Sequence, residues 1–220
     1  MTSFILKIIA VITMLCDHLG YVIFGKFSFM NYIGRLSFPI FAFLITEGYI
    51  HTKNLKKYFA RLLIFAIISQ IPYMLYINAF SNSFSLNILF TLSLGLLGIT
   101  IYDKIKHKSF GILLVILLSF IAQYLKFDYG WYGIVIIFIF YIFKDEKLLM
   151  NIYIFTLIFI NYFFYYNASS RIEYLFIILF STLSLIPINL YNTKKGKDIK
   201  YFLYIFYPLH LIILYLLTIF

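Results

Sequence analysis

The sequence predicts an all-α integral membrane protein, a polytopic bundle of about nine transmembrane helices, on three observations. Apolar residues make up 64% of the 220 residues and charged residues only 12%, whereas a soluble domain carries roughly twice that charge. The apolar residues gather in runs of about 20, the length that a helix needs to cross the hydrocarbon core. Basic residues stand in short tufts between these runs, which is typical of multi-pass membrane proteins. These features exclude a water-soluble globule and a disordered chain.

The apolar runs predict the individual helices in chain order. We expect one transmembrane domain over residues 1–220, because no leftover stretch is long enough for a soluble domain. The first run holds Asp17 and His18 and lacks a small-residue cleavage site, so we interpret it as a span and not as a signal peptide. The expected spans are roughly 4–24, 33–51, 59–78, 84–102, 109–126, 129–143, 148–166, 172–191 and 201–219.

The distribution of basic residues predicts the orientation. Every second loop is rich in Lys and Arg, and the alternate loops carry few. Because basic loops stay in the cytoplasm, we expect a cytoplasmic N-terminus and an outer C-terminus. The net charge of +10 is then mostly a topology signal, and we expect no nucleic-acid partner. The basic loops have two readings, contact with anionic lipid or binding of an anionic cytoplasmic ligand. The first basic loop carries Lys53, Lys56, Lys57 and Arg61.

Ionisable and amide side chains inside the predicted spans are the candidate functional residues. Such groups are costly in a bilayer and usually face a protein interior. Asp17 and Arg35 fall at similar depth on neighbouring spans, so we expect an ion pair between them. In a structural reading the pair only pins two helices, and in a functional reading it also shapes or charges a substrate cavity. The candidates for substrate binding or structural support are Arg35, Glu47, Gln70 and Asn87.

The catalytic candidates are His18, Asp17 and His210. His18 is either an interhelical hydrogen-bonding residue or an acid/base, and a neutral imidazole can accept a proton from an attacking amine or hydroxyl. His210 follows Pro208, which removes a helix hydrogen bond and predicts a kink beside the histidine. His210 is then either part of the wall of a site or a core histidine beside a kink that the lipid accommodates. Pro39 and Pro72 predict two more opened helices. No Gly-rich phosphate loop, His-Glu-x-x-His motif or clustered Cys/His set occurs, so we expect no metal.

Several stretches carry a family resemblance. The opening is KIIAVITMLCDHLG, and the longest block is NYIGRLSFPIFAFLITEGYIHTKNLKKYFARLLIFAIISQIPY. Later landmarks are NILFTLSLGLL, GWYGIVII and FYPLHLIILYLL, in that order. Together they resemble the TraX family over nearly the whole chain. The block from Asn31 to Tyr73 is the most specific, since short pieces such as YPLHL also occur in other membrane acyltransferases.

The resemblance implies an acetyl-CoA-dependent acetyltransferase of the bacterial cytoplasmic (inner) membrane. The founding member acetylates the N-terminal amine of a conjugative pilin. By match of position, Asp17 and His18 are the candidate catalytic pair, with Arg35, Glu47 and His210 in support. The resemblance thus implies acetyl-CoA as acyl donor and a pilin-like peptide amine as acceptor. The basic loop with Lys53, Lys56, Lys57 and Arg61 has the charge to hold the anionic end of that donor. A surface-glycan hydroxyl is the alternative acceptor. Direct transfer is the preferred mechanism and an acetyl-histidine intermediate the second.

Two other functions remain open at the level of the sequence. Intramembrane charges also suit a transporter or channel for a small anionic or acetylated solute. A non-catalytic scaffold for assembly of a surface polymer is the third reading. The residues do not choose between amine and hydroxyl acceptors, and they assign no oligomeric state.

Overall fold

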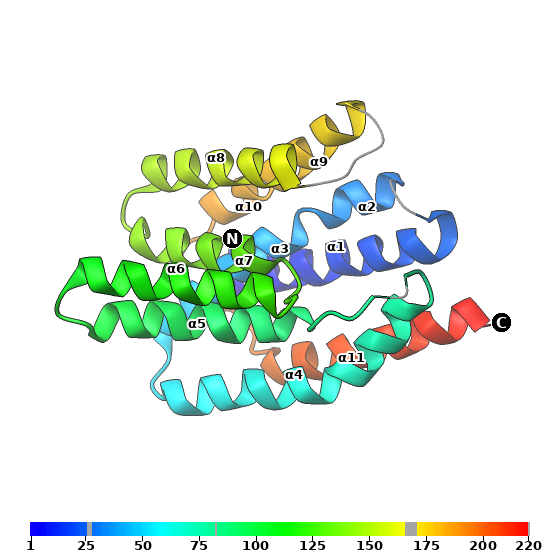
Figure 1. Ribbon diagram of the computed structural model, residues 1–220, viewed down its shortest axis with the longest axis horizontal. Coiled ribbons are helices and arrows are strands. Elements are labelled where there is room, and N and C mark those ends of the chain that lie inside the picture. The colour runs from blue at the N-terminus through cyan, green and yellow to red at the C-terminus, as the bar shows by residue number, and fades with distance from the viewer. Residues whose placement is uncertain (26–27, 82, 166–170, 220) are drawn as a thin grey trace. The chain divides into compact units, whose positions relative to one another are not determined.

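The computed structural model describes residues 1–25, 28–81, 83–165 and 171–219 (Figure 1). Within these residues the secondary structure is eleven helices and no strand. One isolated parallel bridge joins Leu86 and Phe127. The expected all-α class is therefore confirmed.

The helices follow the predicted segments closely. The expected span 33–51 is a pair of helices, α2 and α3, and the span 172–191 is the pair α9 and α10. The span expected over 84–102 begins later, at Ile88, and residues before it form a loop. The last residue of the span expected over 148–166 lies outside the described residues. The helices are α1 Ser3–Phe24, α2 Phe29–Gly34, α3 Ser37–His51, α4 Leu55–Asn78, α5 Ile88–Lys104, α6 Lys108–Tyr124, α7 Gly130–Ile142, α8 Lys147–Tyr165, α9 Arg171–Leu183, α10 Leu185–Asn189 and α11 Lys200–Ile219.

Among the residues that the structure describes, five helical segments are long and apolar enough to cross a membrane. They are Ser3–Phe24, Phe29–His51, Leu55–Asn78, Ile172–Asn189 and Tyr201–Ile219. Helices α6, α7 and the described part of α8 are apolar but shorter. At about 1.5 Å per residue, the 13 residues of α7 reach about 20 Å, less than the bilayer core. The full set of nine crossings and their orientation stay predictions.

Proline explains two of the helix breaks. A proline inside a helix clashes with the carbonyl four residues earlier. Pro39 stands four residues after Arg35, where the chain turns between α2 and α3, and Pro187 stands four after Leu183, where α9 ends. Pro72 and Pro208 end no helix, because α4 and α11 continue through these residues, and the local openings expected there stay predictions.

The chain divides into two compact units. Unit 1 comprises Met1–Leu44 and Phe143–Leu203, and unit 2 comprises Ile45–Ile142 and Tyr204–Phe220. In unit 1, α2 packs against α1 and α9, and α9 also packs against α8. In unit 2, α5, α6 and α7 pack on one another and α4 packs on α5. The α5–α7 core includes Val115, Ala122 and Ile134.

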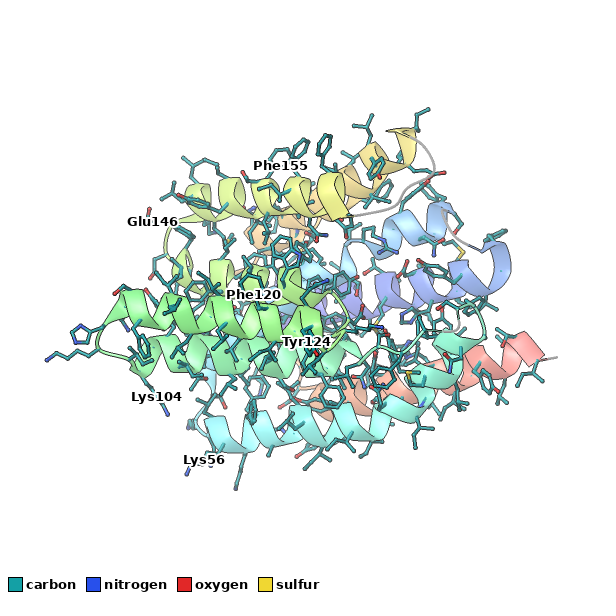
Figure 2. The ribbon with its side chains drawn as sticks, in the orientation of Figure 1. Lys56, Lys104, Phe120, Tyr124, Glu146 and Phe155 are labelled. Atoms are coloured by element: carbon teal, nitrogen blue, oxygen red, sulfur yellow. The ribbon has the colours of Figure 1, made fainter. Side chains whose placement is uncertain are left out.

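The outer surface of α6 shows what kind of solvent the protein needs. Phe120 is 69% exposed and Tyr124 86%, and Figure 2 shows both at the surface of this helix. Leu113 and Leu117 add to the same exposed apolar surface. An apolar patch of this kind on a soluble protein marks an interaction or membrane surface. Together with the long apolar helices it indicates a membrane protein.

Candidate functional site

The most developed polar site of unit 1 lies between α1 and α2. Arg35 Nη2 donates to Asp17 Oδ1 at 3.0 Å, with side-chain exposures of only 10% and 15%. Asn31 Nδ2 donates to the Asp17 backbone carbonyl at 2.8 Å and to Asp17 Oδ1 at 3.3 Å. Arg35 Nε donates in turn to the Asn31 carbonyl at 3.2 Å. The expected Asp17–Arg35 ion pair is present, and Asn31 joins it as a third member.

Local sequence signals hold this cluster in place. Ser28 caps α2, and Ser28 and Asn31 form a reciprocal capping box. The chain turn that follows α2 leaves Arg35 at the end of that helix, beside α1. Ser37 then begins α3 and donates to the Ala10 carbonyl of α1 at 2.9 Å. The turn is therefore tied to α1 on both sides.

Two glycines allow the close approach of α1 and α2. A Cβ at Gly34 would overlap the Asp17 side chain. A Cβ at Gly20 would come within 2.9 Å of Asn31 Nδ2 and 2.8 Å of Ser28 Oγ. Because neither glycine has a side chain, the carboxylate and the amide reach each other directly. Small residues at helix contacts serve this purpose in membrane proteins generally.

His18 lies next to Asp17 on α1 and is half-buried. The positive charge of Arg35 acts on both Asp17 and His18. The two neighbours therefore share one electrostatic centre although their side chains leave the helix in different directions.

Aromatic rings border α2 on the side of α9. Tyr32 stacks on Phe176 with ring centroids 5.3 Å apart and an interplanar angle of 20°. Phe29 meets Phe180 edge to face at 5.8 Å. These contacts fix α2 against α9, so the helix that carries Asn31 is supported from two sides.

His210 belongs to unit 2, whereas Asp17 and His18 belong to unit 1. The side chain of His210 is buried at 4% exposure, and its Nδ1 lies 2.9 Å from the Phe206 carbonyl of the same helix. Its ring stacks on that of Phe206 at 4.8 Å. These contacts place His210 in the interior of unit 2.

Gln70 and Asn87 form one hydrogen-bonded lock in unit 2. Asn87 is fully buried and caps α5. Its backbone N and Nδ2 donate to Gln70 Oε1 at 3.1 and 2.9 Å, and Nδ2 also donates to the Ala66 carbonyl at 2.8 Å. Gln70 Nε2 donates to the Ser85 carbonyl at 2.8 Å. The predicted roles of these amides are substrate binding or structural support, and mutual hydrogen bonds of this kind favour structural support.

Further residues that were not predicted from the sequence extend this lock. The Tyr73 hydroxyl lies 3.1 Å from Ser85 Oγ, and Thr91 donates to the Asp128 carbonyl. Tyr207 is buried at 5% exposure and makes a hydrogen bond with the backbone of Ile88. A buried tyrosine hydroxyl usually has a hydrogen-bond partner, and this rule is the signal that the sequence offers. Tyrosine is so frequent in this sequence that the rule does not single out Tyr73 and Tyr207.

The residues predicted to bind the donor lie at one end of unit 2. Lys53, Lys56 and Lys57 are exposed, and Figure 2 shows Lys56 projecting from the start of α4. Arg61 is half-buried, and its guanidinium carbon lies 5.9 Å from the centre of the Tyr58 ring. No hydrogen-bond partner for the buried Arg61 Nε lies among the described residues.

Glu47 lies near this basic end of unit 2. Glu47 Oε2 is 3.3 Å from His51 Nε2, one turn further along α3. A Cβ at the neighbouring Gly48 would come within 2.6 Å of the Tyr58 hydroxyl, so α3 lies close against the start of α4. Glu47 therefore lies on the last turns of α3, next in sequence to the glycine that meets Tyr58.

A second cluster at the same end was also missed. Asp103 accepts hydrogen bonds from the Tyr49 hydroxyl at 2.6 Å and the Tyr141 hydroxyl at 2.5 Å. These residues come from α3, α5 and α7. No sequence spacing relates them, since only the packed unit brings the three helix ends together.

Comparison with known proteins identifies the family. A model of the family described as TraX protein matches residues 3–218. This chain belongs to the TraX family. The match contains α1 to α10 and nearly all of α11, so every candidate residue of this TraX protein lies inside it.

Two curated proteins are similar to this TraX protein. A probable fimbrial assembly protein, FimC, of Dichelobacter nodosus is 28% identical over 232 residues, which cover 97% of this chain and 94% of that protein. The uncharacterized protein RP591 of Rickettsia prowazekii is 28% identical over 159 residues, or 70% of this chain and 61% of that protein. No solved structure matches.

Proposed function

We propose that this TraX protein is an acetyltransferase that moves an acetyl group from cytoplasmic acetyl-CoA to an acceptor amine or hydroxyl. The observation that carries the proposal is the Asp17–Arg35–Asn31 cluster with His18 beside it, inside a chain that matches the TraX family over residues 3–218. Buried charge of this kind inside a membrane span is costly and is usually kept for function. We place the protein in the bacterial cytoplasmic membrane, with residues 1–220 acting as one domain.

His18 is the proposed general base. In direct transfer, the acceptor nitrogen attacks the thioester carbonyl carbon and forms the new N–C bond. His18 takes the proton from that nitrogen, the C–S bond breaks with its electron pair going to sulfur, and His18 returns the proton to the sulfur so that coenzyme A leaves as its thiol. A thioester is already activated, so positioning and one base supply the catalysis without a metal or an acyl-enzyme. Asp17 and Arg35 act as positioning residues, because they fix the charge next to the imidazole.

The basic end of unit 2 is the proposed donor site. Acetyl-CoA carries several negative charges on its nucleotide end, which suits exposed lysines and a guanidinium with donors to spare. Lys53, Lys56 and Lys57 are exposed there, and Arg61 Nε is buried without a partner among the described residues. The proposed acceptor is a pilin-like peptide N-terminus, and a surface-glycan hydroxyl is the alternative. The similarity to a probable fimbrial assembly protein supports the peptide.

The test compares two histidine variants of the purified full chain. We expect His18→Ala to lower acetyl transfer by about 100-fold or more, the usual contribution of a general base, while acetyl-CoA still raises the melting temperature. His107→Ala is the matched control, since His107 stands exposed before α6 and makes no side-chain capping bond. Release of coenzyme A measured with a synthetic pilin N-terminal peptide provides the readout. Near wild-type turnover of the His18 variant would remove this residue from the mechanism.

Intramembrane charge also suits the second candidate, a transporter or channel for a small anionic or acetylated solute. The two functions separate in sealed liposomes. A transporter moves solute without any acyl donor, whereas the proposed enzyme consumes acetyl-CoA and releases coenzyme A. Solute movement without thioester cleavage would contradict the acetyltransferase.

A further inference from the structure

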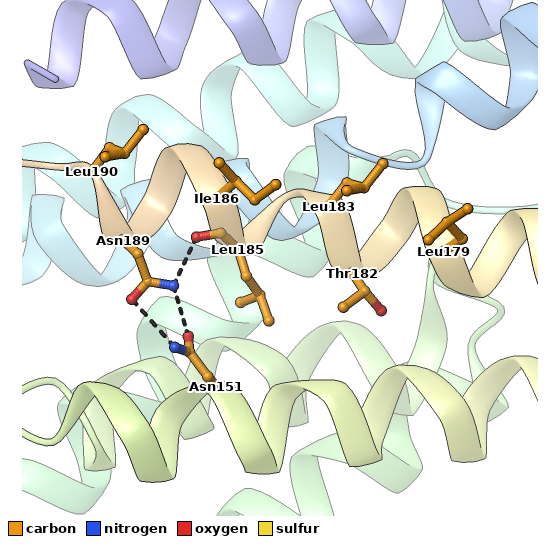
Figure 3. Close-up of a pocket in the computed structure, with 8 residues that line it drawn as sticks. All are labelled: Asn151, Leu179, Thr182, Leu183, Leu185, Ile186, Asn189 and Leu190. Atoms are coloured by element: carbon orange, nitrogen blue, oxygen red, sulfur yellow. Dashed lines mark hydrogen bonds between the residues drawn. The ribbon is translucent and has the colours of Figure 1, made fainter.

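An open groove runs along α9 and α10 beside α8 in unit 1 (Figure 3). Its volume is about 540 Å³, within the range of small-molecule sites. Four aliphatic side chains, spaced four, three and four residues apart along the helices, form one side of the groove, called here the aliphatic bank. Thr182, Leu185 and Asn189 point to the other side, toward α8. The aliphatic bank consists of Leu179, Leu183, Ile186 and Leu190.

The groove is apolar and stays open to the surroundings. Leu179 is 52% exposed, Ile186 57% and Leu190 59%. The main polar groups of the groove are the side-chain amides of Asn151 and Asn189. These two amides hydrogen-bond each other at 3.0 and 3.3 Å, so they are already satisfied without an occupant. An occupant therefore gains chiefly by covering aliphatic surface, which favours a hydrocarbon chain over a polar metabolite.

The length of the groove fits half of a bilayer. From Leu179 to Leu190 the helix advances about 16 Å at about 1.5 Å per residue, and the hydrocarbon core of a bilayer is about 30 Å thick. One acyl chain from one leaflet covers that distance. A docked helix, about 10–12 Å across, needs more room than this volume gives.

Cationic groups gather where the groove ends. The Met1 ammonium donates to the Leu190 carbonyl, and Lys147 Nζ lies 3.4 Å from the Asn189 carbonyl. The N-terminus is tied to the basic segment after α10, since Asn192 N donates to the Met1 carbonyl at 2.9 Å and Ser3 N donates to the Lys194 carbonyl at 2.8 Å. Lys194, Lys195 and Lys197 are exposed on that segment.

Acidic groups at this end are fewer. Asp145 and Glu146 share the loop before α8, and Asp198 pairs with Lys195 at 2.9 Å. Six cationic groups, namely Met1, Lys144, Lys147, Lys194, Lys195 and Lys197, stand against these three carboxylates. The local charge is therefore positive, and basic pockets between transmembrane helices are suited to anionic lipid headgroups.

We infer that the α8–α10 groove is a binding site for an anionic phospholipid. One acyl chain lies along Leu179 to Leu190, and the phosphate lies at the end marked by the Met1 ammonium, Lys147 and Lys194. The site is independent of the proposed acetyl transfer, because none of its residues is assigned to donor, acceptor or base. Its occupant ties this end of unit 1 to the anionic leaflet.

Native mass spectrometry of the purified full chain tests the site, with phosphatidylglycerol and phosphatidylcholine of identical acyl chains as probes. We expect one phosphatidylglycerol to be retained with at least tenfold preference. Ile186→Trp fills the groove and lowers retention tenfold or more, whereas Ile116→Trp does not, since Ile116 is similarly exposed (46%) but lies on α6. Leu190→Trp repeats the test at the groove mouth if the first variant unfolds in neutral detergent.

Neutralising the lysines at the basic end of the groove separates the contribution of the lipid headgroup charge from that of the acyl chain. Lys147→Gln with Lys194→Gln weakens phosphatidylglycerol binding by about fivefold per lysine, because each basic residue near a headgroup contributes about 1 kcal/mol, and leaves phosphatidylcholine binding unchanged. Lys104→Gln with Lys106→Gln is the control on the α5–α6 loop. Equal retention of the two lipids, or wild-type binding by the groove variants, overturns the inference. A protein captured by a photo-crosslinker at position 186 in place of lipid also overturns it.

Discussion

Asp17 and Arg35 show how a single charge depends on its partner inside this protein. Their side chains are 15% and 10% exposed and meet at 3.0 Å. Removing one member of a buried pair leaves an uncompensated charge, which typically costs about 3–5 kcal/mol, whereas replacing both by neutral groups is far less harmful. Asn31 adds a donor to the same carboxylate, so it lowers the cost of keeping Asp17 inside the bundle.

We therefore predict strong non-additivity between these two residues. Arg35→Met should lower the free energy of unfolding by about 3–5 kcal/mol. The double variant Asp17→Asn with Arg35→Met should recover more than half of that loss, because no charge is left unpaired. Denaturant unfolding in a fixed detergent measures both, with Lys126→Met, an exposed cation, as control. If the losses of unfolding free energy caused by Asp17→Asn and by Arg35→Met simply add in the double variant, the two residues are not coupled.

At the scale of elements, the approach of α1 to α2 depends on glycine. A Cβ at Gly34 would overlap the Asp17 side chain, whereas a Cβ at Gly98 on α5 would find its nearest neighbour at an ordinary 3.6 Å. We predict that Gly34→Ala costs about 1–3 kcal/mol of stability through overpacking. Gly98→Ala should be neutral or stabilising by up to about 1 kcal/mol, because alanine favours the helix. Thermal unfolding of both variants in one detergent checks the contrast, and equal effects would mean that α1 and α2 are not in this close contact.

The same scale shows how much of the structure the sequence predicts. Apolar run length locates all the helical segments, and the rule that proline clashes four residues back accounts for the breaks at Arg35 and Leu183. The rule fails at Pro72 and Pro208, where the helices continue. Membrane helices tolerate proline where neighbouring groups re-satisfy the freed backbone, and no local pattern in the sequence reports such neighbours.

The candidate sites were predictable to the extent that depth in the membrane limits the possible partners. Asp17 has one suitable counter-ion at its level, so the pair with Arg35 follows from the sequence. Two other contacts do not follow from the sequence, because several amides and many tyrosines share those depths. They are the Gln70–Asn87 lock and the Asp103 cluster with Tyr49 and Tyr141. These contacts are selected by which helices pack together, and that information is not local.

At the scale of the whole molecule, charge is concentrated at the ends of the helices. We predict that Lys56→Glu with Lys57→Glu raises the KM for acetyl-CoA by tenfold or more and changes kcat by less than about twofold. The physical reason is that exposed lysines attract the anionic end of the donor without touching the reacting thioester. The KM effect should shrink as salt rises, because exposed charges are screened. Lys104→Glu with Lys106→Glu is the matched control on another basic loop, and an equal loss there would indicate general attraction instead of a donor site.

The predicted orientation of the chain depends on whether α7, an apolar helix of 13 residues, crosses the membrane. With about 20 Å of length, α7 falls short of a bilayer of about 30 Å, and it crosses only if flanking residues or local thinning make up the difference. The alternation of basic loops requires that it cross. We predict that, in a Cys16→Ser background, a cysteine at Lys144 is labelled by an impermeant maleimide only after the membrane is opened, whereas one at Lys126 is labelled in intact cells. Lys194→Cys and Lys53→Cys, on two further basic loops, should behave like Lys144→Cys. Labelling of positions 126 and 144 from the same side would show that α7 does not cross, and the odd number of spans would then be lost.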